Sequence, residues 1–155
     1  MKPTAKTLIE KLGFQDPDRK SNKHDEIQLW TYHHIDEVLK SFSSPGNTME
    51  ITSRRLEYPI KQTTGNWSSV VGYVDLLVSG KITNQEGSKD FTAAIEIKSE
   101  IPCLGDLVRQ INFYRQYDLF MSTTWIVISP DDRYQKVLKE QAIYFFKYKA
   151  PGELF

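Results

Sequence analysis

Cysteine is almost absent from this sequence: Cys103 is the only one among 155 residues, so the chain cannot form an internal disulfide. Long hydrophobic stretches are missing as well. There is no apolar leader, and no run of about 20 apolar residues that could cross a bilayer. These absences argue against secretion and membrane insertion, and we expect a cytoplasmic protein.

An excess of charge of either sign is also lacking, because 20 Lys and Arg residues balance 20 Asp and Glu residues. Any attraction to nucleic acid must therefore come from local clusters of basic side chains. Hydrophobic residues make up 39% of the chain and charged residues 26%, as in ordinary globular proteins. We expect a single domain over residues 1–155, with an N-terminal extension at 1–24 and a core at 25–149.

Hydrophobic periodicity divides the core into helices and strands. Apolar residues at helical spacing alternate with segments rich in β-branched and aromatic residues, separated by polar, turn-like clusters. Such an order is typical of an α/β layer with a mixed sheet. The pattern predicts helices at 25–42, at 104–119 and from Pro130 onward, strands at 49–62, 70–83, 91–99 and 123–129, and a strand or further helix at 142–149.

Three charged residues stand out in two of the predicted strands. Asp75 interrupts a segment that is otherwise apolar on both faces, and a buried carboxylate needs a partner or a metal. Glu96 and Lys98 lie two positions apart, so their side chains leave the same face of the next strand. If these strands pair, two carboxylates and one ammonium group converge.

Such a site has the chemistry needed to hydrolyse a phosphodiester. Two carboxylates suit Mg²⁺ or Mn²⁺, which neutralises charge on the phosphate and lowers the pKa of an attacking water. The Lys98 ammonium group can position that water or offset negative charge in the transition state.

The motifs Gly72-Tyr-Val-Asp75, Glu96-Ile-Lys98 and Gln110-Ile-Asn-Phe-Tyr114 occur in this order. The series resembles the GxxD, ExK and QxxxY motifs of RecB-type nucleases in the PD-(D/E)xK superfamily, over residues 25–128. The resemblance implies a restriction-endonuclease-like α/β core, a mixed sheet flanked by helices. It departs from the family where Val74 replaces proline, and where no four-cysteine set could hold an iron–sulfur cluster.

The resemblance also implies roles for individual residues. Asp75, Glu96 and the backbone carbonyl of Ile97 would bind the metal, and Gln110 would orient the substrate or Lys98. Tyr114 would line the site from the helix. We further consider the helix acid Glu26 as a metal ligand, and Arg109 and Arg115 as phosphate contacts.

Each of these residues also has a simpler interpretation. Glu96 and Lys98 could face solvent, the tyrosines could pack, and the arginines and Glu26 could be ordinary helix-surface residues. The histidine that RecB-type nucleases often have in an early helix has no unambiguous counterpart, because His24, His33 and His34 all lie in or near the first helix. Neither His33 nor His34 has metal-ligand spacing with another His or Cys. Arg54, Arg55 and Lys61 form a basic group near Tyr58, and Trp67 in the hairpin turn could stack on a base.

The leading hypothesis is a Mg²⁺- or Mn²⁺-dependent deoxyribonuclease whose partner is nucleic acid, with no membrane association. A chain of this size would need a homodimer or a partner chain for sequence-specific cleavage. The alternative is a catalytically inactive module on the same fold that binds nucleic acid or protein. A third hypothesis, an α/β domain without a site, predicts that Asp75 and Glu96 lie far apart.

Overall fold

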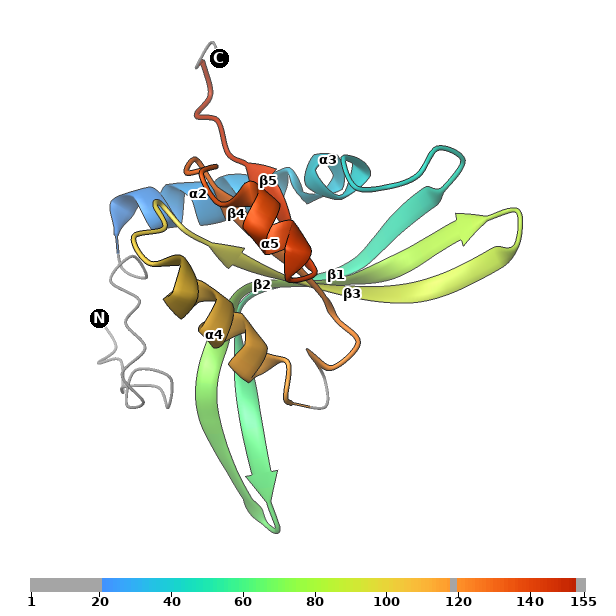
Figure 1. Cartoon of the computed structure of the whole chain (residues 1–155). Coiled ribbons are helices and arrows are strands. Elements are labelled where there is room, and N and C mark those ends of the chain that lie inside the picture. Colours follow the sequence, from blue (N-terminus) through green and yellow to red (C-terminus); the bar gives the residue numbers. More distant parts are fainter. Residues whose placement is uncertain (1–20, 118–119, 153–155) are drawn as a thin grey trace.

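The computed structural model describes residues 21–117 and 120–152 (Figure 1). Most of the predicted extension and the end of the helix predicted at 104–119 lie outside these residues. The elements in chain order are α2 (Asn22–His33), α3 (Ile35–Lys40), β1 (Thr48–Thr64), β2 (Trp67–Asn84), β3 (Gly87–Ile97), α4 (Leu104–Tyr114), β4 (Thr124–Ser129), α5 (Gln135–Glu140) and β5 (Ile143–Lys147).

The five strands form one sheet in the order β1-β2-β3-β4-β5. The first three pair antiparallel as a meander, whereas β4 and β5 each join parallel to the preceding strand. Parallel neighbours need a crossover connection, which α4 provides between β3 and β4, and α5 between β4 and β5. The predicted α/β architecture, a mixed sheet flanked by helices, is confirmed.

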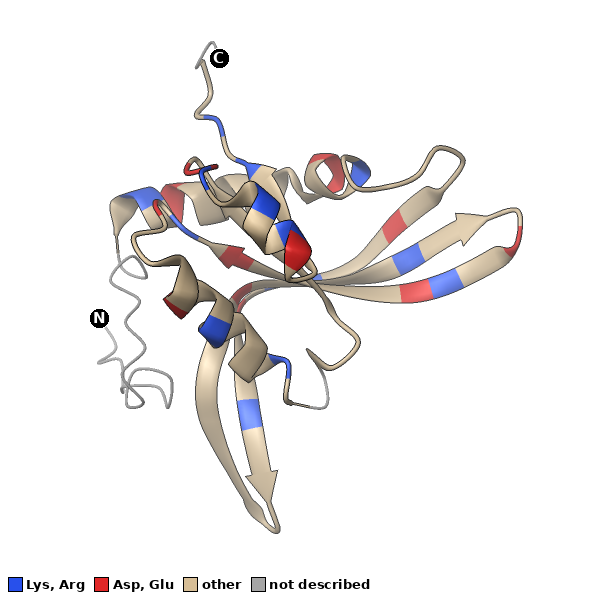
Figure 2. Cartoon of the chain, viewed as in Figure 1, with Lys and Arg blue, Asp and Glu red and all other residues tan. Residues whose placement is uncertain are grey.

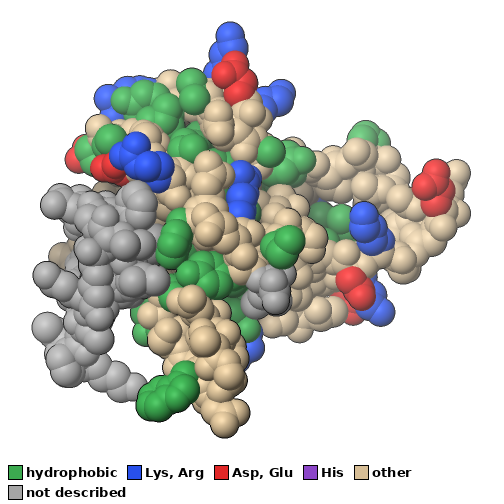
Figure 3. Space-filling model, turned by 60° about the horizontal axis from the view of Figure 1, so that its bottom comes forward, with side chains coloured by type: hydrophobic (Ala, Val, Ile, Leu, Met, Phe, Trp, Pro, Cys, Tyr) green, Lys and Arg blue, Asp and Glu red, His purple; other side chains and the backbone are tan. Residues whose placement is uncertain are grey.

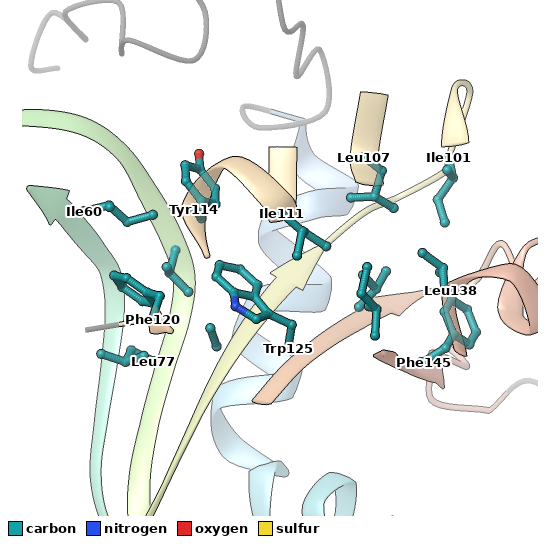
Figure 4. Packing of buried hydrophobic residues seen from close by; sticks show 14 of the residues in the cluster. Ile60, Leu77, Ile101, Leu107, Ile111, Tyr114, Phe120, Trp125, Leu138 and Phe145 are labelled. Atoms are coloured by element: carbon teal, nitrogen blue, oxygen red, sulfur yellow. The ribbon is translucent and has the colours of Figure 1, made fainter. Parts of the chain in front are cut away.

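Helices cover both faces of the sheet. The cluster on one face joins α4 and α5 to Trp125 and Val127, and the cluster on the other joins α2 and α3 to Ile126 and Ile128. Alternate residues of β4 thus face opposite layers, which explains its near-continuous apolar sequence. Figure 4 shows the first cluster, in which Tyr114 stacks on Trp125 at 5.8 Å between ring centroids.

The helix predicted at 25–42 is divided into α2 and α3 at His34. His34 has φ −116° and ψ 21°, and its ring lies against Trp30, with Nδ1 2.8 Å from the Trp30 carbonyl oxygen. The helix also begins earlier than predicted, because Ser21 caps it by accepting a hydrogen bond from the His24 amide at 3.0 Å. The second main helix begins at Leu104 as predicted.

The third helix begins at Gln135 rather than near Pro130. The preceding residues are engaged instead in a loop contact: Asp131 accepts a hydrogen bond from the Ile101 amide at 2.9 Å, and Arg133 donates one to the Ile101 carbonyl at 3.1 Å. This contact ties the chain that follows β3 to the chain that follows β4. The last segment, for which strand or helix was open, is strand β5.

Strands β1 and β2 contain 17 and 18 residues, longer than predicted, because the turn between them contains only Gly65 and Asn66. β3 pairs only with the part of β2 from Leu76 to Asn84. The remaining β1–β2 hairpin therefore projects from the sheet as a two-stranded arm, at the bottom of Figure 1. Among the described residues, no helix has the length and apolar character needed to span a membrane.

Candidate active site

Pairing of β2 with β3 brings the two predicted acids together. The β2–β3 ladder ends with the pair Leu76 and Ile95, and Asp75 and Glu96 are the next residues on the two strands. Both are buried in the sheet, at 4% and 1% relative exposure. The acids therefore do not lie far apart, as a domain without a site would predict.

Both carboxylate oxygens of Asp75 have close neighbours. Oδ2 accepts a hydrogen bond from the Ile97 amide at 2.8 Å, and Oδ1 lies 3.3 Å from Nε2 of His24. Burial alone would raise the pKa of Asp75. The interaction with His24, the charge of Lys98 and the Ile97 amide outweigh it, so the pKa lies below its ordinary value. Asp75 is therefore an ionised carboxylate at neutral pH.

Lys98 lies beside Glu96, with Nζ 3.4 Å from Oε1. Both side chains are buried. They share a face because Lys98 directly follows the end of β3 and lies two residues after Glu96. The intervening Ile97 packs on the opposite face, against the helices α2 and α3. The Lys98 amide donates to the Ile128 carbonyl at 3.0 Å, which extends the β3–β4 ladder to this position. The solvent-facing interpretation of Glu96 and Lys98 is therefore wrong.

Helix α4 carries Gln110 and Tyr114, and both are buried. Gln110 Nε2 lies 3.4 Å from the Tyr114 hydroxyl oxygen, and Tyr114 is only 1% exposed. The Tyr114 ring covers Gly72 of β2 so closely that a Cβ at residue 72 would lie 2.5 Å from its hydroxyl oxygen. The first and last motifs of the series are thus in direct contact, three residues before Asp75.

The other predicted site residues make contacts of their own. Glu26 is exposed on α2 and pairs with Lys23 at 3.3 Å, and Arg109 is exposed and pairs with Asp106. Arg115 donates hydrogen bonds to the carbonyls of Gln141 and Ala142 at 3.1 and 2.8 Å, so its guanidinium group holds the turn before β5. His33 and His34 are exposed. None of these ion pairs and hydrogen bonds involves Asp75, Glu96 or Lys98.

Two residues near Asp75 were assigned no role from the sequence. His24 is fully buried, within the segment assigned to the extension, and Gln28 follows one turn later on α2. Gln28 donates hydrogen bonds to the Asp75 carbonyl at 2.8 Å and to Glu57 Oε1 at 3.0 Å. His24 and Gln28 are four residues apart, and so are Ile27 and Thr31, which lie beside them on the helix. This spacing is the signal that could have indicated a buried polar face.

The donor set is compatible with a hard divalent cation. Asp75 and Glu96 offer carboxylate oxygens from adjacent strands, with the backbone of Ile97 between them. Within residues 21–117 and 120–152, no group of three or more His, Cys, Asp and Glu side chains is arranged to hold a metal. Two carboxylates supplemented by a carbonyl, water and substrate are a common arrangement for Mg²⁺.

No protein-family model matches this sequence, and no curated protein matches it significantly. Three solved structures match this chain. The chain is 17% identical to a repair endonuclease from Pyrococcus abyssi (TM-score 0.44, covering 88% of this chain and 50% of that one). It is 14% identical to EndoMS in apo form (TM-score 0.41, covering 85% of this chain and 48% of that one). It is 15% identical to EndoMS in a complex with double-stranded DNA (TM-score 0.41, covering 90% of this chain and 50% of that one). The chain spans about half the length of these proteins.

Proposed function

We propose that this chain is a nuclease that hydrolyses phosphodiester bonds in DNA with the help of Mg²⁺ or Mn²⁺. One observation carries the proposal: Asp75 is hydrogen-bonded to the amide of Ile97, the residue that separates Glu96 from Lys98. This bond holds the Asp75 carboxylate beside the segment that carries Glu96 and Lys98, and all three side chains are buried. A stabilising ion pair would need only two of these groups.

Asp75 and Glu96 would hold the cation, together with the carbonyl of Ile97. When bound, such an ion neutralises charge on the phosphate and lowers the pKa of an attacking water. The depressed pKa of Asp75 keeps its carboxylate available as a ligand without the loss of a proton. The hydrogen bond from the Ile97 amide fixes the orientation of the carboxylate before any substrate arrives.

Lys98 would act on the water and on the phosphate. Its buried ammonium group, 3.4 Å from Glu96, is held where it can orient an attacking water or offset charge on the phosphoryl oxygens. Gln110, a neutral donor on α4, would position Lys98 or the substrate. Its amide is itself placed by Tyr114, which packs on Gly72.

The test is degradation of labelled DNA by the purified chain with Mg²⁺ or Mn²⁺, and its loss with EDTA. Asp75→Asn, Glu96→Gln and Lys98→Met should each lower the cleavage rate on the order of 100- to 1,000-fold. Asp90→Asn and Lys89→Met are matched controls, because both residues are exposed on β3, the strand that carries Glu96 and ends next to Lys98. Cleavage that survives the first three substitutions, in protein with an unchanged circular dichroism spectrum, would contradict the assignment.

A non-catalytic module is the second candidate. It is favoured by the ion pairs themselves, because Glu96 lies beside Lys98 and Asp75 beside His24. The melting temperature separates the two candidates. A cation at 100 times its dissociation constant stabilises a protein by about 2.7 kcal/mol, or roughly 5 to 10 °C for a chain of this length. The nuclease should show such a shift with Mn²⁺, and Asp75→Asn should abolish it. A purely structural network should show neither effect.

A further inference from the structure

A groove of about 600 Å³ lies between the projecting β1–β2 hairpin and the C-terminal end of α4. One wall is formed by β1, and the opposite wall by the residues that follow α4. A groove of this volume is in the range of small-ligand sites. The residues on which the argument rests are Arg55, Tyr58, Lys61 and Gln62 from β1, and Tyr117 and Phe120 from the far wall.

Cations and aromatic rings make up the chemistry of the groove. Arg55 and Lys61 are exposed, whereas Tyr58 and Tyr117 are partly buried. The Arg55 guanidinium lies over the Tyr58 ring at 5.1 Å, which orients the guanidinium along the wall. The groove as described is lined by no carboxylate. A ligand with both anionic groups and flat rings would satisfy this set.

The distribution of charge supports an anionic ligand. In the hairpin segment between Tyr58 and Asp75, Lys61 is the only charged residue, and Figure 2 shows it as a single blue band on the lower arm. The β2–β3 hairpin, by contrast, carries mixed charges such as Lys81 and Asp90. In the space-filling view of Figure 3, carboxylate side chains lie toward the margins of the visible face.

Trp67 extends the aromatic character beyond the groove. It is 82% exposed, so a large apolar side chain at the hairpin turn remains in contact with water, which is unfavourable. Trp67 pairs with Thr64, and Thr64 is two residues from Gln62, which lines the groove. The side chains of Trp67 and Gln62 therefore leave the same face of the hairpin. An exposed indole on a two-stranded arm is a suitable platform for an unpaired base.

Both walls of the groove are connected by short stretches of chain or by strand pairing to residues of the candidate active site. On β1, Tyr58 pairs with Val74, the residue before Asp75. On the other side, Tyr117 follows Gln110 and Tyr114 along α4 and the turn after it.

We propose that this groove binds single-stranded DNA, with phosphates on Arg55 and Lys61 and bases against Tyr58, Tyr117 and Trp67. The inference rests on the proposed function, since it names the form of DNA that would enter that site. In a duplex, stacked and paired bases cannot present their faces to tyrosine or tryptophan rings, whereas unpaired bases can. Sequence preference would be weak, because every base has a face that can stack.

Binding is measured separately from cleavage. Fluorescence anisotropy with a labelled oligothymidine of about a dozen nucleotides, in EDTA, gives the affinity of the full chain. Trp67→Ala should weaken binding about 5- to 100-fold, the effect of removing one stacked base. Tyr144→Ala is the matched control, because Tyr144 is an exposed aromatic on the distant strand β5. It should bind as the wild type does.

Salt dependence tests the cations. Lys61→Ala should reduce the slope of log affinity against log salt by about 0.7, the value for one phosphate contact on a single strand. Lys81→Ala, an exposed lysine on the other arm, should leave the slope unchanged. Both hairpin positions are exposed, so these variants should fold, and unchanged melting temperatures would show that they do.

The inference is overturned if the wild type does not bind the oligothymidine, or if Trp67→Ala and Lys61→Ala bind like their controls. It is also overturned if a duplex of equal length binds as tightly and depends equally on Trp67. Binding that follows the expected pattern in a chain that cleaves no DNA with Mg²⁺ or Mn²⁺ would retain the groove and refute the nuclease. Metal-dependent cleavage, with no effect of either variant on binding, would retain the nuclease and refute the groove.

Discussion

Replacing Gly72 by alanine should displace the Tyr114 ring and destabilise the protein, although the change adds only one methyl group. A Cβ at residue 72 would lie 2.5 Å from the Tyr114 hydroxyl oxygen and 2.6 and 2.8 Å from two ring carbons. Carbon atoms in favourable contact are about 3.5 to 4.0 Å apart, so the ring would have to retreat by about 1 Å. Tyr114 cannot do so freely, because it is buried and stacked on Trp125.

The expected size of the effect follows from these contacts. Overpacking of a buried site costs about 1 to 3 kcal/mol. The lower entropy of the unfolded alanine chain offsets about 0.4 to 1 kcal/mol of this. At the midpoints of these ranges the net loss is about 1.3 kcal/mol, which should lower the melting temperature by about 3 to 5 °C. Urea unfolding and thermal melts measure it directly. Gly105→Ala is the control, because its added Cβ would meet only the flexible end of Arg109 at 3.4 Å.

A double-mutant cycle identifies the cause. In the Tyr114→Leu background the ring is gone, so Gly72→Ala should become neutral or slightly stabilising. The difference between the two backgrounds should be at least about 1 kcal/mol, as for residues in direct contact. If Gly72→Ala is as stable as the wild type, or equally destabilising in both backgrounds, then the glycine is not required by the tyrosine. The contact between the two motifs would then have no energetic meaning.

Two further substitutions test the framework around the site. Gly80→Ala should cost about 3 kcal/mol or more in urea unfolding, because its Cβ would collide with the backbone carbonyl of Glu50, which cannot move without disturbing the β1–β2 ladder. Asp131→Asn should remove part of the acid sensitivity of the fold. The hydrogen bond from Arg133 holds the pKa of Asp131 below its ordinary 3.8, so the stability that this carboxylate adds is complete above that pH and is lost as the pH falls below it. The stability advantage of the wild type over Asp131→Asn should therefore shrink between pH 5 and pH 2 in urea titrations, and a constant difference would contradict this.

The strands were predictable because their signal is local. β-branched and aromatic residues mark β1, β2 and β3, and the continuous apolar run of β4 reflects burial on both faces. The break at His34 was not predictable, since it depends on a ring contact with Trp30 within an otherwise periodic helix. The late start of α5 depends on Asp131 and Arg133 binding the backbone of Ile101, a contact between distant segments.

In the candidate site, too, some residues could be predicted from local sequence and others depend on tertiary contacts. Alternation along two strands and an acid in an apolar segment are local features, and they led to Asp75, Glu96 and Lys98. His24 could not be found this way, because its burial requires α2 to begin before residue 24 and to pack over β2. The roles proposed for Glu26, Arg109 and Arg115 remain predictions. Their side chains pair with Lys23, with Asp106 and with backbone carbonyls.

The alignment of the site depends on a group that no motif can specify. Asp75 is oriented by the backbone amide of Ile97 through one oxygen and by the proximity of His24 to the other, while Gln28 holds its carbonyl. Every residue type except proline offers an amide at position 97. Side-chain motifs therefore determine which groups are present, whereas the strand register determines whether they share one position. A one-residue slip between β2 and β3 would move these side chains to the opposite face and separate them. The buried apolar residues of both layers, which fix that register, are for this reason as necessary to the chemistry as the charged residues.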